Sequence, residues 1–332
     1  MAPHPTIQKR INAFSDLIPI EFHAQWGHSD AQFIEGRMVQ TGIIDTPRYW
    51  FSPVKRSHLG FWEFISSFDG PIQEPTLFTL IDDVTGELAY RAFLGSVGKK
   101  DGYIGFTVNL NIARFAAMPR ARTFYFEATA TRVSGRKVLI ECPLYDAESS
   151  VLLMVARAVF VFMPLANIAN KISTPSGDHA LEPRLDAPDA CEIAISELHQ
   201  LGQVMNFLPH GVIAHTGGLF SAGDARLLVS LDFGTNISGP PIYVHGGVLA
   251  TVLYNASALL LAKTTGVNDS LVDPAERDIN YLKGVPLECQ NAAIEAVIEA
   301  TDSNRVVIFA KLMHGKHTYT TLKTTFALPQ TS

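Results

Sequence analysis

The chain has few cysteines and few charges. Cys142, Cys191 and Cys289 stand far apart in 332 residues, at spacings that fit neither a zinc site nor a disulfide framework. Charged residues make up 17% of the sequence and the net charge is −6, which argues against the broad basic surface of a protein that binds nucleic acid or an anionic membrane. We therefore expect a cytoplasmic protein with reduced thiols, no metal site, and no nucleic-acid or membrane partner.

Signals of several enzyme classes and of export are also missing. The sequence has no Gly-x-Ser-x-Gly elbow of a serine hydrolase and no Walker or dinucleotide-binding fingerprint. The first sixteen residues contain no apolar run of the kind that a secretory signal needs. Apolar residues are abundant, at 47% of the chain, which is enough for a large core. The uncharged stretch Val248–Ala262 is interrupted by Tyr254 and Asn255, and its length favours a buried helix over a membrane span.

The chain repeats itself. Asn111–Pro119 matches Asp278–Pro286, and both segments end in proline at the same offset. Each half is expected to hold one apolar helix, then two strands around a polar turn, then a closing β-rich segment. In the first half these segments are Thr76–Arg91, Ala128–Ile140 and Val151–Phe162, and in the second they are Gly247–Lys263, Ala296–Ile308 and Thr318–Ala327.

A helix that is apolar nearly all round has to be enclosed by other elements. A curved antiparallel sheet around each helix meets this need, so we predict an α+β double hotdog fold with two curved sheets, each wrapping a central apolar helix. We expect an N-terminal hotdog domain over residues 1–165 and a C-terminal one over residues 191–332. Residues 166–190 are rich in Pro, Ser, Asn and Asp and are predicted to be a linker.

His245, Gly246 and Gly247 stand where the second helix is expected to begin. The first N–H groups of a helix have no partner within it, and the macrodipole makes that end partly positive. Glycine allows a ligand atom to approach the backbone closely. These amides can therefore stabilise the oxyanion that forms when a carbonyl group is attacked. A tight turn into the helix is the simpler alternative for the same three residues.

The stretch Pro240–Gly247, followed by apolar Val248–Leu253, resembles the signature of PaaI-like hotdog acyl-CoA thioesterases. The resemblance implies thioester hydrolysis, with the carbonyl group held by the amide of Gly247 and supported by Gly246. It also implies that His245 fixes the loop. Members of the family carry an Asp or Glu about nine residues after the His, but here the chain has Tyr254, followed by Asn255. The second half therefore lacks the reacting acid.

The first half supplies a candidate acid. Aligning the two apolar helices sets Asp82 against Tyr254 and Asp83 against Asn255, and "LIDDVTG" resembles the acid-bearing helix of the family. Gly247 and position 254 of one helix are separated by about 10 Å, so one helix cannot easily present both the amides and the acid. We expect one composite site with Asp82 as the acid and Asp83 as the alternative. The mirror position, where Gln73, Glu74 and Pro75 would face Tyr254 and Asn255, should be inactive because Pro75 has no N–H.

Three further residues complete the predicted site. The family resemblance implies a hydroxyl on the strand after the first helix to orient water, and this residue is Thr107. Family members often carry a second amide donor before the His, and Asn236 or Ser238 could replace it here. The alternative is that Thr107 has no role in the site, because threonine is common in strands.

The sequence thus predicts an acyl-CoA thioesterase that takes a small-molecule acyl thioester as substrate and needs no cofactor. The sequence leaves open whether double-hotdog chains assemble into a homo-oligomer. One alternative is a hydratase or dehydratase of acyl thioesters that uses His245 and Asp82. A second is a non-catalytic acyl- or polyketide-binding protein. The acyl chain, and the choice between CoA and acyl-carrier protein, cannot be read from the sequence.

Overall fold

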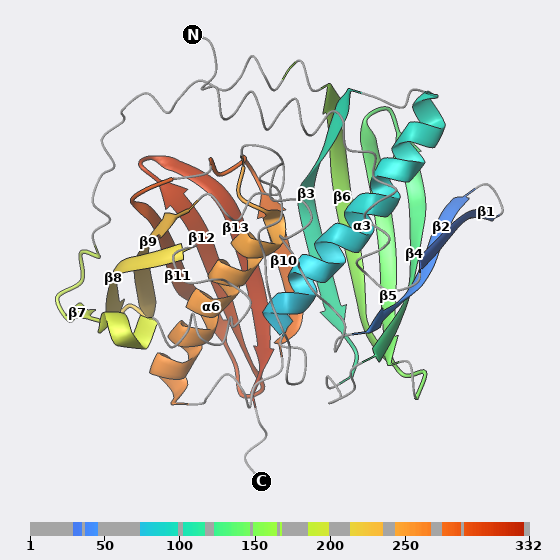
Figure 1. The fold of residues 1–332 in the computed structure, drawn as a ribbon. Helices are drawn as coiled ribbons and strands as arrows, with labels where there is room; N and C mark the ends of the chain where they lie inside the picture. Colours follow the sequence, from blue (N-terminus) through green and yellow to red (C-terminus); the bar gives the residue numbers. More distant parts are fainter. Residues whose placement is uncertain are drawn as a thin grey trace.

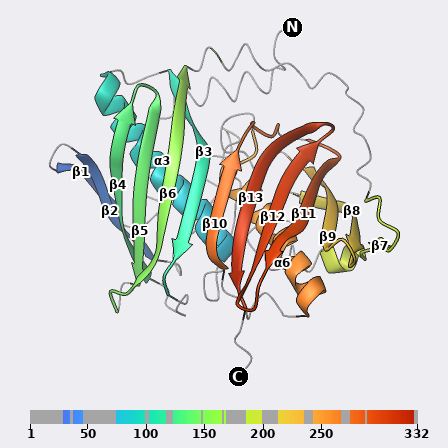
Figure 2. The same cartoon turned by 180° about the vertical axis from the view of Figure 1, so that it is seen from behind.

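The structure of the chain is a computed structural model. It describes residues 29–34, 37–45, 74–98, 102–116, 123–146, 149–164, 167, 185–198, 213–234, 243–266, 274–286 and 289–328. These residues form one antiparallel sheet of thirteen strands and two long helices. Figure 1 shows α3 (Glu74–Val97) and α6 (Gly246–Thr265) on the same face of this sheet, and Figure 2 shows the opposite face.

The strands fall into two groups along the chain. The first group is β1 (Ser29–Ile34), β2 (Arg37–Asp45), β3 (Tyr103–Arg114), β4 (Thr123–Ser134), β5 (Lys137–Asp146) and β6 (Leu152–Pro164). The second group is β7 (Cys191–Glu192), β8 (Ile213–Ser221), β9 (Arg226–Phe233), β10 (Pro274–Tyr281), β11 (Ala292–Thr301), β12 (Arg305–His314) and β13 (His317–Ala327).

The order of the strands confirms the internal repeat. Across the sheet it is β1-β2-β4-β5-β6-β3-β10-β13-β12-β11-β9-β8-β7, so each half reads the same way outward from the β3–β10 pair. In each half the helix comes directly before the central strand. Asn111 is paired with Asp278 in the middle of β3 and β10, and these two residues begin the matching sequence segments. The repeat in sequence is therefore a repeat in topology.

The two sheets predicted as separate are one continuous sheet. β3 and β10 pair antiparallel, which satisfies backbone groups that would otherwise form two open edges. The pair is also joined on the outer face, where Asn109 Nδ2 donates to Asp278 Oδ1 at 2.8 Å and Asn111 Nδ2 donates to Glu276 Oε1 at 3.2 Å. The predicted boundaries at residues 165 and 190 stay a prediction, and most of the predicted linker lies outside the described residues.

Both predicted helices are present and longer than expected. Helix α6 is buried without interruption from Gly247 to Leu261, and it ends at Gly266, whose φ of 69° is the left-handed conformation that glycine adopts readily. Among the described residues α6 alone is long and apolar enough to cross a bilayer, but 83% of its most apolar window is buried inside the protein. This burial agrees with a core helix. Most buried apolar side chains of α3, α6 and the sheet belong to one core that runs through both halves, while Leu228 and Ala293 pack with Leu185 in a small separate cluster.

Candidate functional site

The carboxylate of Asp82 lies where the two halves meet. Asp82 is on α3, and its side chain is only 6% exposed. Thr107 of β3 donates a hydrogen bond from Oγ1 to Asp82 Oδ1 at 2.7 Å. The acid and the hydroxyl of the first half are therefore in direct contact, at a position that faces the beginning of α6.

A β-bulge directs Thr107 toward the helices. Leu110 and Ile112 of β3 are buried in the core, so simple alternation would place Thr107 on the outer face with Asn109 and Asn111. The register of β3 against β6 shifts between Thr107 and Asn109. Such a shift changes which face the preceding residues occupy, and bulges often re-aim a side chain beside a functional site. Simple alternation along β3 therefore does not account for the direction of Thr107.

His245 caps α6 with its side chain. The Gly247 N–H donates to His245 Nδ1 at 3.0 Å, and His245 has the extended backbone typical of an N-cap. The preceding residue is tied to the loop after β10 by the bond from Val244 N to Val285 O at 2.8 Å. The Gly247 amide, expected to be open, thus has an acceptor in this structure. Because Nδ1 accepts, a neutral His245 ring carries its proton on Nε2.

The start of α6 and the acid of α3 are in close contact. A Cβ atom on Gly246 would lie 2.7 Å from Asp82 Oδ2, which is closer than real Cβ atoms come, so only glycine fits there without displacing the carboxylate. His245 Nε2 lies 3.9 Å from the same Oδ2 atom. Asp82, Thr107, His245, Gly246 and Gly247 are therefore brought together from both halves.

Burial raises the pKa of Asp82 above its ordinary value. Three neighbours oppose this effect: the charge of His245 when it is protonated, the hydrogen bond from Thr107, and the N–H of Gly247. These groups favour the charged carboxylate and burial disfavours it. A carboxyl group with a raised pKa in a buried contact between two helices is suited to accept a proton during a reaction.

One residue of this cluster was not predicted as a site residue. Tyr281, the last residue of β10, donates a hydrogen bond from its hydroxyl to Gly246 O at 3.0 Å. Burial and the charge of Asp82 raise the pKa of Tyr281 well above its ordinary value, so it remains a neutral donor. The only signal in the sequence is its place in the repeated segment Asp278–Pro286. That place indicates a strand beside the site but not which side chain reaches it.

The mirror position holds aromatic rings and an arginine. Tyr254, which aligns with Asp82, packs its ring 5.8 Å from that of Phe78 and 6.0 Å from that of Phe326. The guanidinium of Arg277 lies 5.4 Å from the Phe78 ring and 5.9 Å from the Tyr254 ring. Arg277 is fully buried, and burial lowers its pKa to about 9, so it is still charged at neutral pH. This packing occupies the space that corresponds to the carboxylate of the first half.

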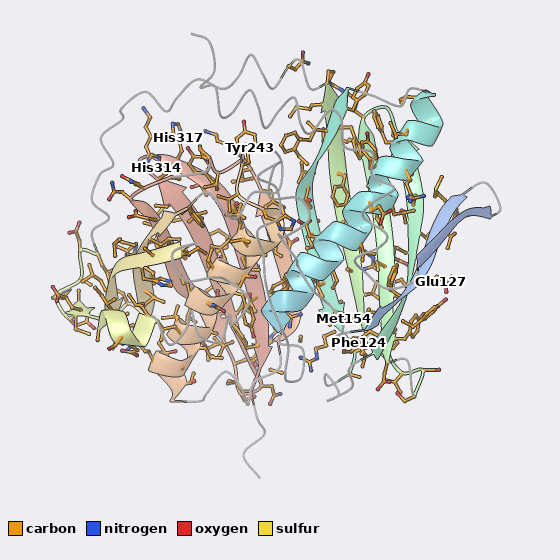
Figure 3. The ribbon with its side chains drawn as sticks, viewed as in Figure 1. Phe124, Glu127, Met154, Tyr243, His314 and His317 are labelled. Atoms are coloured by element: carbon orange, nitrogen blue, oxygen red, sulfur yellow. The ribbon has the colours of Figure 1, made fainter. Side chains whose placement is uncertain are left out.

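Several predicted residues are not placed. Asn236, Ser238 and Gln73 lie outside the described residues, and so does the side chain of Asp83, although its backbone belongs to α3. Within the described ranges, no group of three or more His, Cys, Asp or Glu side chains could hold a metal ion. Figure 3 shows Tyr243, which precedes His245 by two residues, at the same end of the second half as His314 and His317.

No protein-family model matches this chain, and no curated protein sequence is significantly similar to it. Solved structures are similar to it. A candidate oleoyl thioesterase from Lactobacillus plantarum has a TM-score of 0.50 and 11% identity, over 90% of this chain and 100% of that one. An acyl-CoA thioesterase II from Mycobacterium marinum has a TM-score of 0.46 and 11% identity, over 91% and 96%. A hot dog fold protein of unknown function from Alicyclobacillus acidocaldarius has a TM-score of 0.43 and 12% identity, over 94% and 99%. At these identities, what the chain shares with the Lactobacillus protein is its fold.

Proposed function

We propose that the protein is an acyl thioester hydrolase of double-hotdog form, with one composite site between its two halves. The observation that carries this proposal is the contact between Asp82 of α3 and the amino-terminal end of α6, at Gly246. A carboxylate beside the partly positive end of a helix combines a base with donors for a developing oxyanion. The solved structures named as thioesterases support the fold on which such a site could be built, and they support the activity only at that level.

In the proposed reaction the thioester carbonyl oxygen shares the Gly247 N–H, which also donates to His245 Nδ1, in a bifurcated hydrogen bond, with Gly246 allowing close approach. Asp82, held by Thr107, removes a proton from the attacking water, or attacks the carbonyl carbon itself to give a mixed anhydride that water then hydrolyses. His245 caps the helix and holds the loop. The products are a carboxylic acid and a free thiol. Asn236 and Ser238 remain candidates for additional substrate contacts, and Asp83 remains the alternative acid.

The distance between His245 and Asp82 favours a second function, the hydration of an acyl thioester. His245 Nε2 lies 3.9 Å from Asp82 Oδ2, and an imidazole facing a carboxylate across a hotdog helix pair could move protons in the hydration of an acyl thioester. In that reaction His245 would be a proton donor or acceptor as well as a cap.

The experiment that separates the two is an assay against a panel of acyl-CoAs, in which released thiol and double-bond absorbance are followed together. Asp82→Asn keeps the shape of the side chain and removes its charge. His245→Asn keeps a side-chain oxygen that can cap α6 and removes the imidazole. Ala would lose both functions of His245 at once, so Asn is the sharper variant.

Hydrolysis predicts thiol release in the wild type, its loss in Asp82→Asn, and a loss of less than about tenfold in His245→Asn, because the cap is retained. Hydration predicts a change in double-bond absorbance that falls by about 10²- to 10⁴-fold in either variant, the usual contribution of a general acid or base. Tight binding of acyl-CoA without turnover of any substrate would overturn both proposals and favour the binding protein.

A further inference from the structure

Tyr281 lies beneath the first turn of α6. Along β10, Arg277 and Ile279 are fully buried, and strand alternation places Tyr281 on the same face, toward the helices. A Cβ atom on Gly246 would lie 3.4 Å from the Tyr281 ring, so ring and helix are in van der Waals contact. The phenol therefore packs under the residue that also touches Asp82.

The hydrogen bond of Tyr281 acts on a single peptide group. Its hydroxyl donates to Gly246 O at 3.0 Å, and this carbonyl belongs to the same planar peptide as the Gly247 N–H. In a trans peptide the C=O and the N–H point in opposite directions, so a donor that holds the oxygen also fixes the direction of the N–H. A donor on the carbonyl also polarises the peptide and makes the N–H a stronger donor.

This peptide needs support from outside the helix. It joins two consecutive glycines, which have the widest backbone freedom of any residue, and it lies in the first turn, where the helix fixes its own amides least. His245 holds the peptide from the N–H side by accepting from Gly247 N at 3.0 Å. Tyr281 holds it from the carbonyl side.

We propose that Tyr281 is a positioning residue whose hydroxyl, bonded to Gly246 O, holds the Gly246–Gly247 peptide and so fixes the Gly247 N–H in the first turn of α6, where it donates to His245 Nδ1 beside the Asp82 carboxylate. The effect of Tyr281 on turnover rests on the hydrolase proposed above. Its effect on the pKa of Asp82 does not, because the hydrogen bond from Tyr281 to Gly246 O forms without substrate.

The polar groups that face Asp82 determine how its pKa should change when Tyr281 loses its hydroxyl. They are Thr107 from β3, His245 and the Gly247 N–H from α6, and Tyr281 from β10. On α3 itself, the hydroxyl of Thr85 donates to Ile81 O at 2.6 Å and to Asp82 O at 3.2 Å, so it serves the helix backbone. The Gly247 N–H lowers the pKa of Asp82. Loss of its fixed direction should therefore raise that pKa.

The test compares Tyr281→Phe with Tyr319→Phe. The first variant keeps the ring and removes only the hydroxyl. The second removes a hydroxyl from the residue next to Thr320, the cross-strand partner of Tyr281, and serves as the matched control. The pKa of Asp82 is measured by carboxyl ¹³C NMR on protein labelled at aspartate, with the signal assigned by its loss in Asp82→Asn.

We expect a higher pKa for Asp82 in Tyr281→Phe and no change in Tyr319→Phe. In turnover, Tyr281→Phe should lower kcat by about five- to tenfold, the worth of one hydrogen bond, leave KM within about twofold, and move the acid limb of the pH profile upward. An unchanged Asp82 pKa in a folded Tyr281→Phe variant overturns the inference. A wild-type protein that hydrolyses no acyl thioester overturns the proposed function instead, and the NMR titration still decides the role of Tyr281.

Discussion

Thr107 Oγ1 lies 2.7 Å from Oδ1 of Asp82, and this bond joins the central strand of the first half to its helix. Thr107→Val removes the hydroxyl and keeps the β-branched shape that the strand favours. Hydrogen bonds to charged groups contribute about 1.5–3 kcal/mol, so kcat/KM for acyl-CoA hydrolysis should fall about 10- to 100-fold. Because the lost bond lowers the pKa of Asp82, the acid limb of the pH–rate profile should also move to higher pH.

The matched control is Thr324→Val on β13. Thr324 is fully buried, and its hydroxyl has no hydrogen-bond partner among the residues that the structure describes, so this variant makes the same chemical change without breaking a described bond. It should leave kcat/KM and the pH profile as in the wild type. Equal activity of Thr107→Val and Thr324→Val would show that the Thr107 bond has no part in turnover.

Gly246→Ala should displace the carboxylate of Asp82. The new Cβ would lie 2.7 Å from Asp82 Oδ2, so one of the two must move. A misplacement of about 1 Å can cost about 100-fold in rate, and we expect a loss of this size in kcat/KM. The fold should survive, because Ala is a better helix former than Gly. Gly217→Ala on β8, where a Cβ meets open space, should keep full activity. A fully active Gly246→Ala variant would contradict the close contact described here.

The charge of Asp82 should cost stability. Its pKa in the folded protein is raised above the ordinary 3.8, so the ionised group favours the unfolded chain. Asp82→Asn should therefore increase the free energy of unfolding at pH 7 by about 0.5–2 kcal/mol, even though it abolishes activity. The difference should shrink as the pH falls through the folded-state pKa and vanish below the unfolded one. Urea unfolding from pH 2 to pH 8 measures it.

Asp189 provides a control of opposite sign. Its carboxylate accepts from Ser221 Oγ and from Gly223 N, both at 2.6 Å, and these bonds lower its pKa. Its ionised form therefore stabilises the fold, and Asp189→Asn should be less stable than the wild type at pH 7. That deficit should disappear as the pH falls through the lowered pKa. If both variants shift stability in the same direction, burial does not govern the pKa of Asp82.

The repeat and its consequence for the site could be predicted because they depend on apolar periodicity. Two uncharged helical segments, each followed by matching strand patterns, predict two equivalent helices, and their alignment sets Asp82 against Tyr254. The structure brings Asp82, Thr107, His245 and Gly246 together as that alignment predicts. Their chemical roles stay predictions.

Other features depend on three-dimensional detail that periodicity does not carry. The bulge between Thr107 and Asn109 inverts the faces of β3, and the strand pattern contains no residue that signals it. The two predicted sheets become one because β3 pairs with β10. The paired residues of these strands are 163 (276 − 113) to 171 (280 − 109) positions apart in sequence. The contact of Tyr281 with Gly246 lies within the second half and depends on how the first turn of α6 packs over the end of β10, which the apolar pattern does not specify.

Tyr254 should matter for stability and not for turnover. Its ring packs against Phe78 and Phe326 and under the guanidinium of Arg277, so the mirror position is filled by core side chains. Tyr254→Leu loses two aromatic contacts and a cation–π contact and should lower the free energy of unfolding by about 2 kcal/mol. The kcat per folded chain should stay within about twofold of the wild type, because the acid, the hydroxyl and the amides of the composite site remain in place. Calorimetric titration with a non-hydrolysable thioether analogue of acyl-CoA should give one bound ligand per chain in both proteins. Two ligands per wild-type chain, or a loss of kcat in Tyr254→Leu that matches Asp82→Asn, would mean that the second half has kept a working site.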